Sequence, residues 1–226
     1  MSGRYGAAVS EPYEPTRQLR KRFHQELDDI DARVIRLFAL VSESVAAASE
    51  SLLAGDTEMA RRLAGRDALV DQLETDLERV AERELLTQTP MGRDMRFLVS
   101  VLRIVPELER SGDLAEHIAQ RAATGLALRL TPTVRGLLEQ LGTTCVEMWQ
   151  GATDAWAERD PEAAERLDTI DDRIDRMHDQ LVEELGKSDI ALPDALQATL
   201  VARFHERLGD HAVHIAERIR YMAVGT

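Results

Sequence analysis

The chain has 226 residues, with 28 Lys or Arg and 41 Asp or Glu, so its formal net charge is 28 − 41 = −13. Apolar residues make up 44% of it, enough to bury a core, which excludes a disordered acidic tail. The acidic balance argues against a nucleic-acid-binding protein and suits a chain that attracts cations or basic protein surfaces. No stretch approaches 18 consecutive apolar residues, and no apolar signal region follows the start, so we expect neither a membrane span nor a secretory signal.

The apolar residues recur at helical spacing throughout, and period-two runs typical of strands are missing, which predicts an all-α protein. The clearest stripe begins at Phe23 and continues to Leu52 in steps of three and four. Gly55-Asp56 and Asp160-Pro161 are helix-end and helix-start signals. Residues 1–16 lack any stripe and are expected to form a flexible tail. The six expected helices span roughly residues 17–54, 57–86, 94–128, 133–158, 161–185 and 194–223.

The two halves of the chain repeat each other. A shift of 104 places residues 56–77 on 160–181, and a shift of 97 places residues 109–121 on 206–218 with nine identities in thirteen positions. We therefore expect two tandem, sequence-similar three-helix bundles of long antiparallel helices, residues 17–128 and 129–226.

Four acid pairs lie at matched positions of the repeat, each spaced i, i+4 so that both side chains share one helix face. The pairs are Asp67 with Asp71, Glu109 with Asp113, Asp171 with Asp175, and Glu206 with Asp210. We place them about 70–130° from the apolar direction of their helices, at the rim of each bundle. Paired acids on neighbouring helices could hold a hard cation, although a single such pair is more often a solvated face.

Three further features accompany the acids. Gly112 and Gly209 lie inside expected helices, which favours either close approach of another backbone or ligand, or tight helix packing. Arg110 and Arg207 follow the first acid of each motif, as a counter-charge, a phosphate contact or an ordinary surface residue. The single Cys145 cannot form an internal disulfide, which favours a reducing compartment.

The segments ELERSGDLAEHIA (107–119) and FHERLGDHAVHIAERI (204–219) resemble the E-R-x-G-D motif of the PhoU family of bacterial phosphate-transport regulators. The likeness extends from about residue 20 over nearly the whole chain. It implies two metal sites, one held by Asp67, Asp71, Glu109 and Asp113 and the other by Asp171, Asp175, Glu206 and Asp210. The implied metal is divalent or multinuclear: iron, zinc, manganese or magnesium. His117 and His214, where the family more often has Asn, are possible additional ligands or ordinary surface residues.

The resemblance also implies a function. It suggests a non-enzymatic, cytoplasmic, homodimeric regulator that lowers phosphate uptake and Pho-regulon expression. Its implied partners are the ATP-binding subunit of the phosphate ABC transporter and the phosphate sensor histidine kinase, so that it meets the membrane only through a complex. Two alternatives stay open. One is a ferritin-like dimetal carboxylate enzyme, although the chain has no Glu-x-x-His motif. The other is a metal-free helical interaction module.

Overall fold

The computed structural model describes residues 14–63 and 68–225, which form helices joined by short loops. The first bundle contains α1 (Glu14–Ala54), α2 (Thr57–Leu63), α3 (Ala68–Gln88) and α4 (Arg93–Ala122). A short 3-10 turn, η1 (Leu126–Arg129), leads to the second bundle of α5 (Pro132–Glu158), α6 (Ala163–Lys187) and α7 (Leu192–Val224). The expectation of an all-α chain with two three-helix bundles is confirmed, and the expected tail falls largely outside the described residues.

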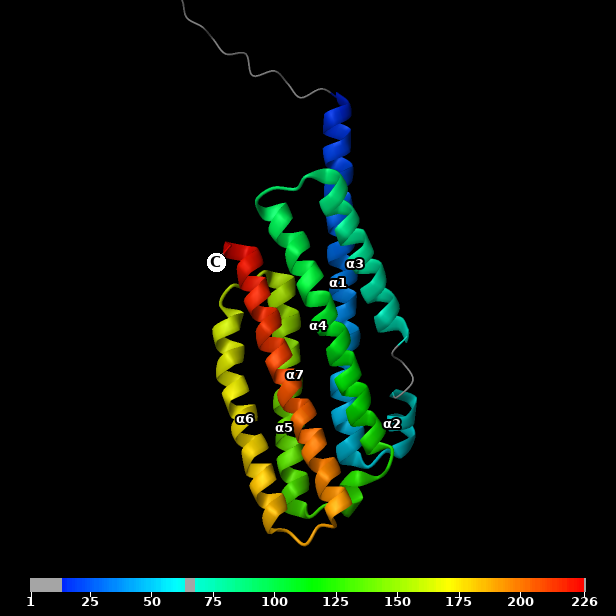
Figure 1. Ribbon diagram of the computed structural model, residues 1–226, viewed down its shortest axis with the longest axis vertical. Helices are drawn as coiled ribbons and strands as arrows, with labels where there is room; N and C mark the ends of the chain where they lie inside the picture. The colour runs from blue at the N-terminus through cyan, green and yellow to red at the C-terminus, as the bar shows by residue number, and fades with distance from the viewer. Residues whose placement is uncertain (1–13, 64–67, 226) are drawn as a thin grey trace, which may run out of the picture.

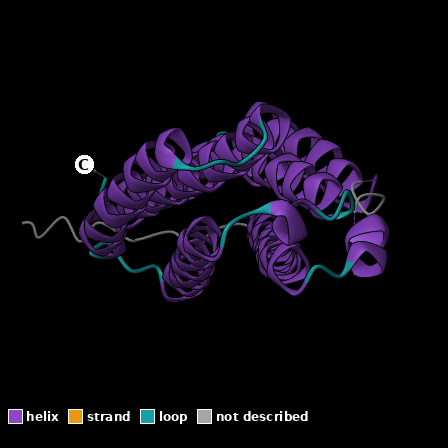
Figure 2. Cartoon of the chain, turned by 90° about the horizontal axis from the view of Figure 1, so that it is seen from below, coloured by secondary structure: helices purple, strands orange, loops and turns teal. Residues whose placement is uncertain are grey.

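The helices lie in two layers (Figures 1 and 2). Helices α6, α7, α4 and α3 follow one another across one layer, and α5 and α1 lie side by side behind them. The two bundles meet along α1 against α5 and along α4 against α7. Buried apolar side chains form one continuous core through both bundles, and the Trp149 and Trp156 rings are fully buried in it.

Local signals explain most of the boundaries. Asp56 caps α2, because its Oδ1 accepts hydrogen bonds from the backbone N–H groups of Glu58 (3.2 Å) and Met59 (2.9 Å). Thr131 caps α5 by accepting from the N–H of Val134 at 3.3 Å, with Pro132 in the first turn.

Two expected helices differ from the structure. The helix expected over 57–86 is described as α2 and α3, with residues 64–67 outside the described residues. The helix expected over 94–128 ends at Ala122, so that boundary was wrong. The reason is Gly125, whose φ of 69° is left-handed and turns the chain into η1. The freed carbonyls of Thr124 and Gly125 accept hydrogen bonds from Arg129 Nη1 at 2.8 and 3.0 Å.

Helix α1 is long and apolar enough over Gln18–Ala54 to span a membrane, judged by length and composition alone. In the described structure, the apolar stripe that runs from Phe23 to Leu52 is buried against the other helices instead. The apolar character of α1 is therefore explained by its place at the centre of the first bundle.

Candidate metal sites between paired helices

The first acidic cluster lies between α3 and α4. Asp71 is exposed on α3, whereas Glu109 and Asp113 are half-buried on α4. Burial raises the pKa of Glu109 to about 7, and the negative charges of Asp113, Glu74 and Asp71 raise it further. The α3 and α4 acids therefore lie close enough for their charges to act on one another. Asp67, the fourth expected ligand, lies outside the described residues.

Glu74 is a member of the first cluster that the repeat did not reveal. Burial raises its pKa, with added contributions from Glu78, Asp71 and Asp113 that Arg110 partly offsets. The sequence does indicate its membership of the cluster, because Glu74 lies three residues after Asp71 and therefore on the same helix face. It escaped notice because the 104-residue shift places His178, and not an acid, at the matched position.

The second acidic cluster lies between α6 and α7. Burial raises the pKa of Asp171 to about 7. Negative charges nearby raise it further, in decreasing order those of Asp210, Asp175, Asp168 and Glu206. The structure therefore brings all four expected acids of this cluster into one electrostatic group. Asp168 is an addition that sequence reasoning missed, because its counterpart under the 104-residue shift is Ala64.

Asp171 Oδ1 is the most informative atom of the second cluster. It is buried and accepts no hydrogen bond from the described residues, which is costly for a charged oxygen. The oxygen lies against Gly209 of α7, where a Cβ atom would come within 2.3 Å of it. The glycine that the repeat singled out thus makes room for a carboxylate of α6.

The donors are not gathered into a closed cage. Within residues 14–63 and 68–225, no three His, Cys, Asp or Glu side chains are close enough to hold an ion as they stand. Glu206 is paired with Arg203 on its own helix, so it would have to release that arginine to bind a cation. The unpartnered Asp171 oxygen and its all-carboxylate surroundings nevertheless fit a hard cation, since carboxylates lose their mutual repulsion when they share one.

The structure gives the two histidines neighbours other than these carboxylates. The His117 ring packs against Phe204 of α7, with 5.4 Å between ring centroids. His214 lines a groove between α4 and α7 together with Glu107 and Arg110. Cys145 is fully buried, and burial raises the pKa of its thiol well above the usual range, which argues against a reactive thiolate.

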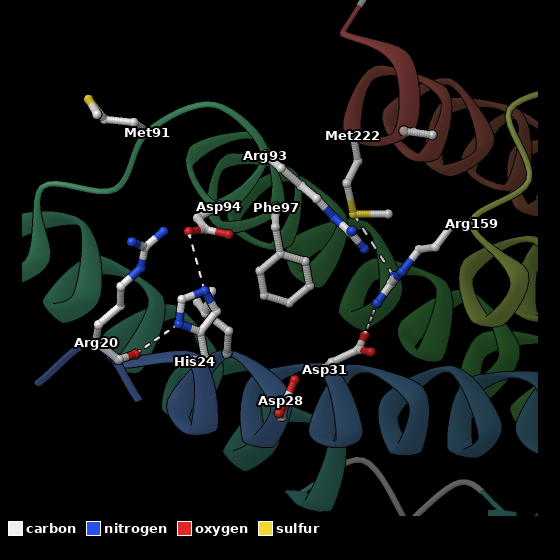
Figure 3. Close-up of a pocket in the computed structure, with 12 residues that line it drawn as sticks. Arg20, His24, Asp28, Asp31, Met91, Arg93, Asp94, Phe97, Arg159 and Met222 are labelled. Atoms are coloured by element: carbon white, nitrogen blue, oxygen red, sulfur yellow. Dashed lines mark hydrogen bonds and ion pairs between the residues drawn. The ribbon is translucent and has the colours of Figure 1, made fainter. Parts of the chain in front are cut away.

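A separate cavity of about 760 Å³ opens at one end of the molecule, where residues of α1, α4 and α7 meet the end of α5 (Figure 3). Two charged contacts lie in it: Arg159 contacts Asp31 at 2.6 Å, and His24 lies 3.9 Å from Asp94. None of the described residues expected to bind metal lines this cavity.

Comparison with known proteins agrees with this architecture. The family model described as PhoU domain matches twice, over residues 34–122 and 138–219. The chain is 30% identical over 223 residues to the phosphate-specific transport system accessory protein PhoU homolog 1 of Mycobacterium leprae, covering 92% of this chain and 95% of that protein. The PhoU homolog of Pseudomonas aeruginosa is 30% identical over 217 residues, covering 93% and 89%.

Solved structures show the same fold. The crystal structure of PhoU from Pseudomonas aeruginosa superposes with a TM-score of 0.85 at 29% identity, covering 90% of this chain and all of that one. The phosphate transport system regulatory protein PhoU from Streptococcus pneumoniae gives 0.80 at 26% identity, covering 90% and 98%. With both bundles matched by the family model and near-complete coverage of its relatives, the chain belongs to the PhoU family.

Proposed function

We propose that this chain regulates phosphate transport, and that it does so by lowering phosphate uptake and Pho-regulon signalling when phosphate is plentiful. The observation that carries the proposal is the match of the PhoU domain to both halves of one chain, alongside relatives named as accessory proteins of the phosphate-specific transport system. The proposed partners are the ATP-binding subunit of the phosphate ABC transporter and the phosphate sensor histidine kinase, both reached from the cytoplasm by a homodimer. The role is one of docking and needs no catalysis.

The test of this role is genetic and biochemical. In a strain lacking this protein, uptake of radiolabelled phosphate and expression of a Pho-regulon reporter in rich phosphate should rise, and the intact chain should restore both. Purified chain should be retained by the immobilised transporter ATP-binding subunit and by the kinase. Unchanged uptake and reporter levels, with no retention by either partner, would contradict the proposal.

We further propose that both acidic clusters bind divalent cations as part of this role. At the second site the ligands would be Asp171, Asp175, Glu206 and Asp210; at the first, Asp71, Glu109 and Asp113, together with Asp67. A bound cation would neutralise the carboxylates and tie α3 to α4 and α6 to α7, which would fix the surface that partners contact. Because the described donors are carboxylates, and His117 packs on Phe204, hard ions such as magnesium, manganese or iron are favoured over zinc.

The metal proposal is tested by removing one ligand from each site. Asp113→Ala combined with Asp210→Ala should abolish Mn²⁺ binding in calorimetry and in elemental analysis, while circular dichroism stays helical. A matched control replaces Glu82 and Asp172, which are exposed acids of α3 and α6, by Ala and should bind Mn²⁺ as the original chain does. Equal Mn²⁺ binding by both double variants would show that the ligands are misassigned, and no binding by the original chain would favour a metal-free interaction module.

A further inference from the structure

A basic groove follows the seam where α4 of the first bundle meets α7 of the second. It encloses about 430 Å³. The two helices run side by side in the middle of the four-helix layer (Figure 1), and are joined there by Ser100 Oγ, which donates to the Arg218 carbonyl at 3.3 Å. The polar and charged residues that line the groove are Arg103, Glu107, Arg110, His214 and Arg218.

The charge of this groove contrasts with that of the chain. Three guanidinium groups face a single carboxylate, in a protein whose formal net charge is −13. Among these arginines only Arg110 is paired with that carboxylate, through Nη1 to Glu107 Oε1 at 3.1 Å. The other oxygen, Glu107 Oε2, lies 3.5 Å from His211 Nε2 on α7. Arg103 and Arg218 form no ion pair with any acid among the described residues. Two uncompensated guanidinium groups at one cavity are therefore available to an anion.

The groove lies between the two acidic clusters. Arg110 lowers the pKa of both Glu109 and Glu74, so its guanidinium is close to the first cluster as well as lining the groove. On the other helix, His214 follows Asp210 by one helical turn and lines the groove from the α7 side. An anion in the groove would thus lie near both clusters, where cation binding on either side would strengthen its attraction.

We propose that this groove binds inorganic phosphate, as an oxyanion held across the two bundles. Arg103 and Arg218 would each donate N–H groups to phosphate oxygens, an interaction that the planar guanidinium forms in paired geometry. Arg110 and His214 are placed to add further donors. A phosphate in this position would bridge α4 to α7 and so couple the two bundles.

Glu107 gives the groove a means of selecting phosphate. At neutral pH phosphate still carries at least one proton, whereas sulfate carries none. A carboxylate can accept a hydrogen bond from the phosphate O–H but repels sulfate, which has only acceptor oxygens. Glu107 is the single carboxylate that lines the groove, so it supplies that acceptor.

This inference deepens the proposed function, since it names the small molecule whose level the regulator would report. Its test uses the full chain alone, so that it does not depend on partners. Equilibrium dialysis with radiolabelled orthophosphate is carried out on metal-free protein in chelator and again with Mg²⁺. We expect the double variant Arg103→Gln with Arg218→Gln to bind at least about tenfold more weakly, since two charge-assisted contacts are lost.

The matched control is Arg33→Gln with Arg36→Gln, which removes the same two charges from exposed positions on α1. It should change phosphate affinity by less than about twofold, because exposed charges act weakly over a distance in salt. Equal weakening in both double variants, or no phosphate binding by the original chain under either condition, would overturn the proposal. So would binding in Mg²⁺ that the groove variant retains in full, because that phosphate would be held by metal.

Selectivity is the second readout. Sulfate should compete poorly with phosphate for the original chain and better for Glu107→Gln, whose helicity is checked by circular dichroism. Sulfate that competes equally with phosphate for the original chain would refute phosphate selection. If phosphate binds as expected while the docking experiments fail, the groove assignment stands and the regulatory role falls. If the docking experiments succeed while phosphate does not bind, the regulatory role stands and the groove assignment falls.

Discussion

Asp171 Oδ1 on α6 packs so closely against Gly209 on α7 that a Cβ atom added to the glycine would lie only 2.3 Å from that oxygen. Substitution Gly209→Ala must therefore rotate the carboxylate out of the seam between the two helices. We expect the variant to fold, because alanine favours the helix by about 1 kcal/mol over glycine, and to lose at least about tenfold in Mn²⁺ affinity at one of two sites. Calorimetric titration with Mn²⁺ measures both sites together.

The control for this substitution is Gly136→Ala in α5, where an added Cβ would meet no atom within 4 Å. It should raise thermal stability slightly and leave Mn²⁺ binding unchanged. Unaltered Mn²⁺ titration of the Gly209→Ala variant would show that the Asp171 oxygen takes no part in binding.

The raised pKa of Asp171 predicts that, in metal-free protein, the stability difference between the original chain and Asp171→Asn depends on pH. Its folded pKa of about 7 lies above the ordinary value of 3.8. The stabilisation from its proton is therefore complete below about pH 4 and is lost as pH rises through 7. Asp171→Asn mimics the protonated form, so its advantage over the original chain should be largest at pH 8 and shrink towards pH 5.

We expect that advantage to be of the order of 1 kcal/mol at pH 8, after allowance for solvent screening of a half-exposed group. For a chain of this size it corresponds to a rise in Tm of about 2–4 °C. The measurement is thermal unfolding in chelator at a series of pH values. An advantage that grew as the pH fell would contradict the assignment of Asp171 as an uncompensated carboxylate.

The buried His205 predicts the opposite pH dependence of stability, with a loss as the pH falls. The side chain is fully buried, its Nδ1 donates to the Val201 carbonyl at 2.9 Å, and its Nε2 accepts from the Ser49 hydroxyl at 3.2 Å. Burial lowers its pKa from 6.5 to about 4. Since the unfolded chain then binds the proton more readily, this group costs stability as pH falls from 6.5 towards 4, by at most about 1.4 kcal/mol per pH unit.

The measurement is chemical unfolding of the original chain and of His205→Gln between pH 7 and 4. The variant should be the less stable at pH 7, having lost a well-packed ring, and the difference should narrow in acid. The exposed His24 serves as the control, since His24→Gln should leave the acid sensitivity in place. A constant difference between the original chain and His205→Gln would rule out a buried neutral imidazole.

A contact between the two bundles accounts for a further expected loss of stability. Asp31 of α1 accepts a hydrogen bond from Trp156 Nε1 at 2.9 Å and pairs with Arg159 at 2.6 Å (Figure 3 shows the Arg159 contact). Asp31→Ala leaves the indole N–H of a fully buried tryptophan without its acceptor. We expect unfolding to become easier by about 1–3 kcal/mol.

Urea unfolding followed by tryptophan fluorescence measures this loss. Asp29→Ala, at an exposed position two residues earlier, removes the same charge and should stay within about 0.5 kcal/mol of the original chain. Equal stabilities for the two variants would mean that the contact between the bundles contributes nothing.

Much of the fold was predictable because long apolar stripes and local end signals determine helices directly. The stripe from Phe23 to Leu52 is buried as expected, and Asp56 caps a helix as its position indicated. The end of α4 was not predictable in the same way, since the apolar residues continue past Ala122 and only the left-handed backbone of Gly125 stops the helix.

The candidate sites were predictable only where the two halves agree. Matched acids such as Asp171 and Glu109 came from the repeat, whereas Glu74 has no acidic counterpart and was missed. The pairing of Glu206 with Arg203 would compete with cation binding. The spacing of acids along the sequence does not predict side-chain contacts of this kind. The basic groove depends on how α4 packs against α7, which the repeat between the two halves does not specify.

The unequal neighbours of the two clusters have a physiological consequence. Because Glu74 adds a negative charge to the first cluster and Asp168 adds one to the second, with His178 and Ala64 at the respective matched positions, we expect the two proposed sites to differ in affinity for a cation. One would fill at lower free-ion concentration than the other, which creates a half-occupied form between empty and saturated protein. A duplicated scaffold that has lost its chemical symmetry can in this way report two thresholds with a single polypeptide.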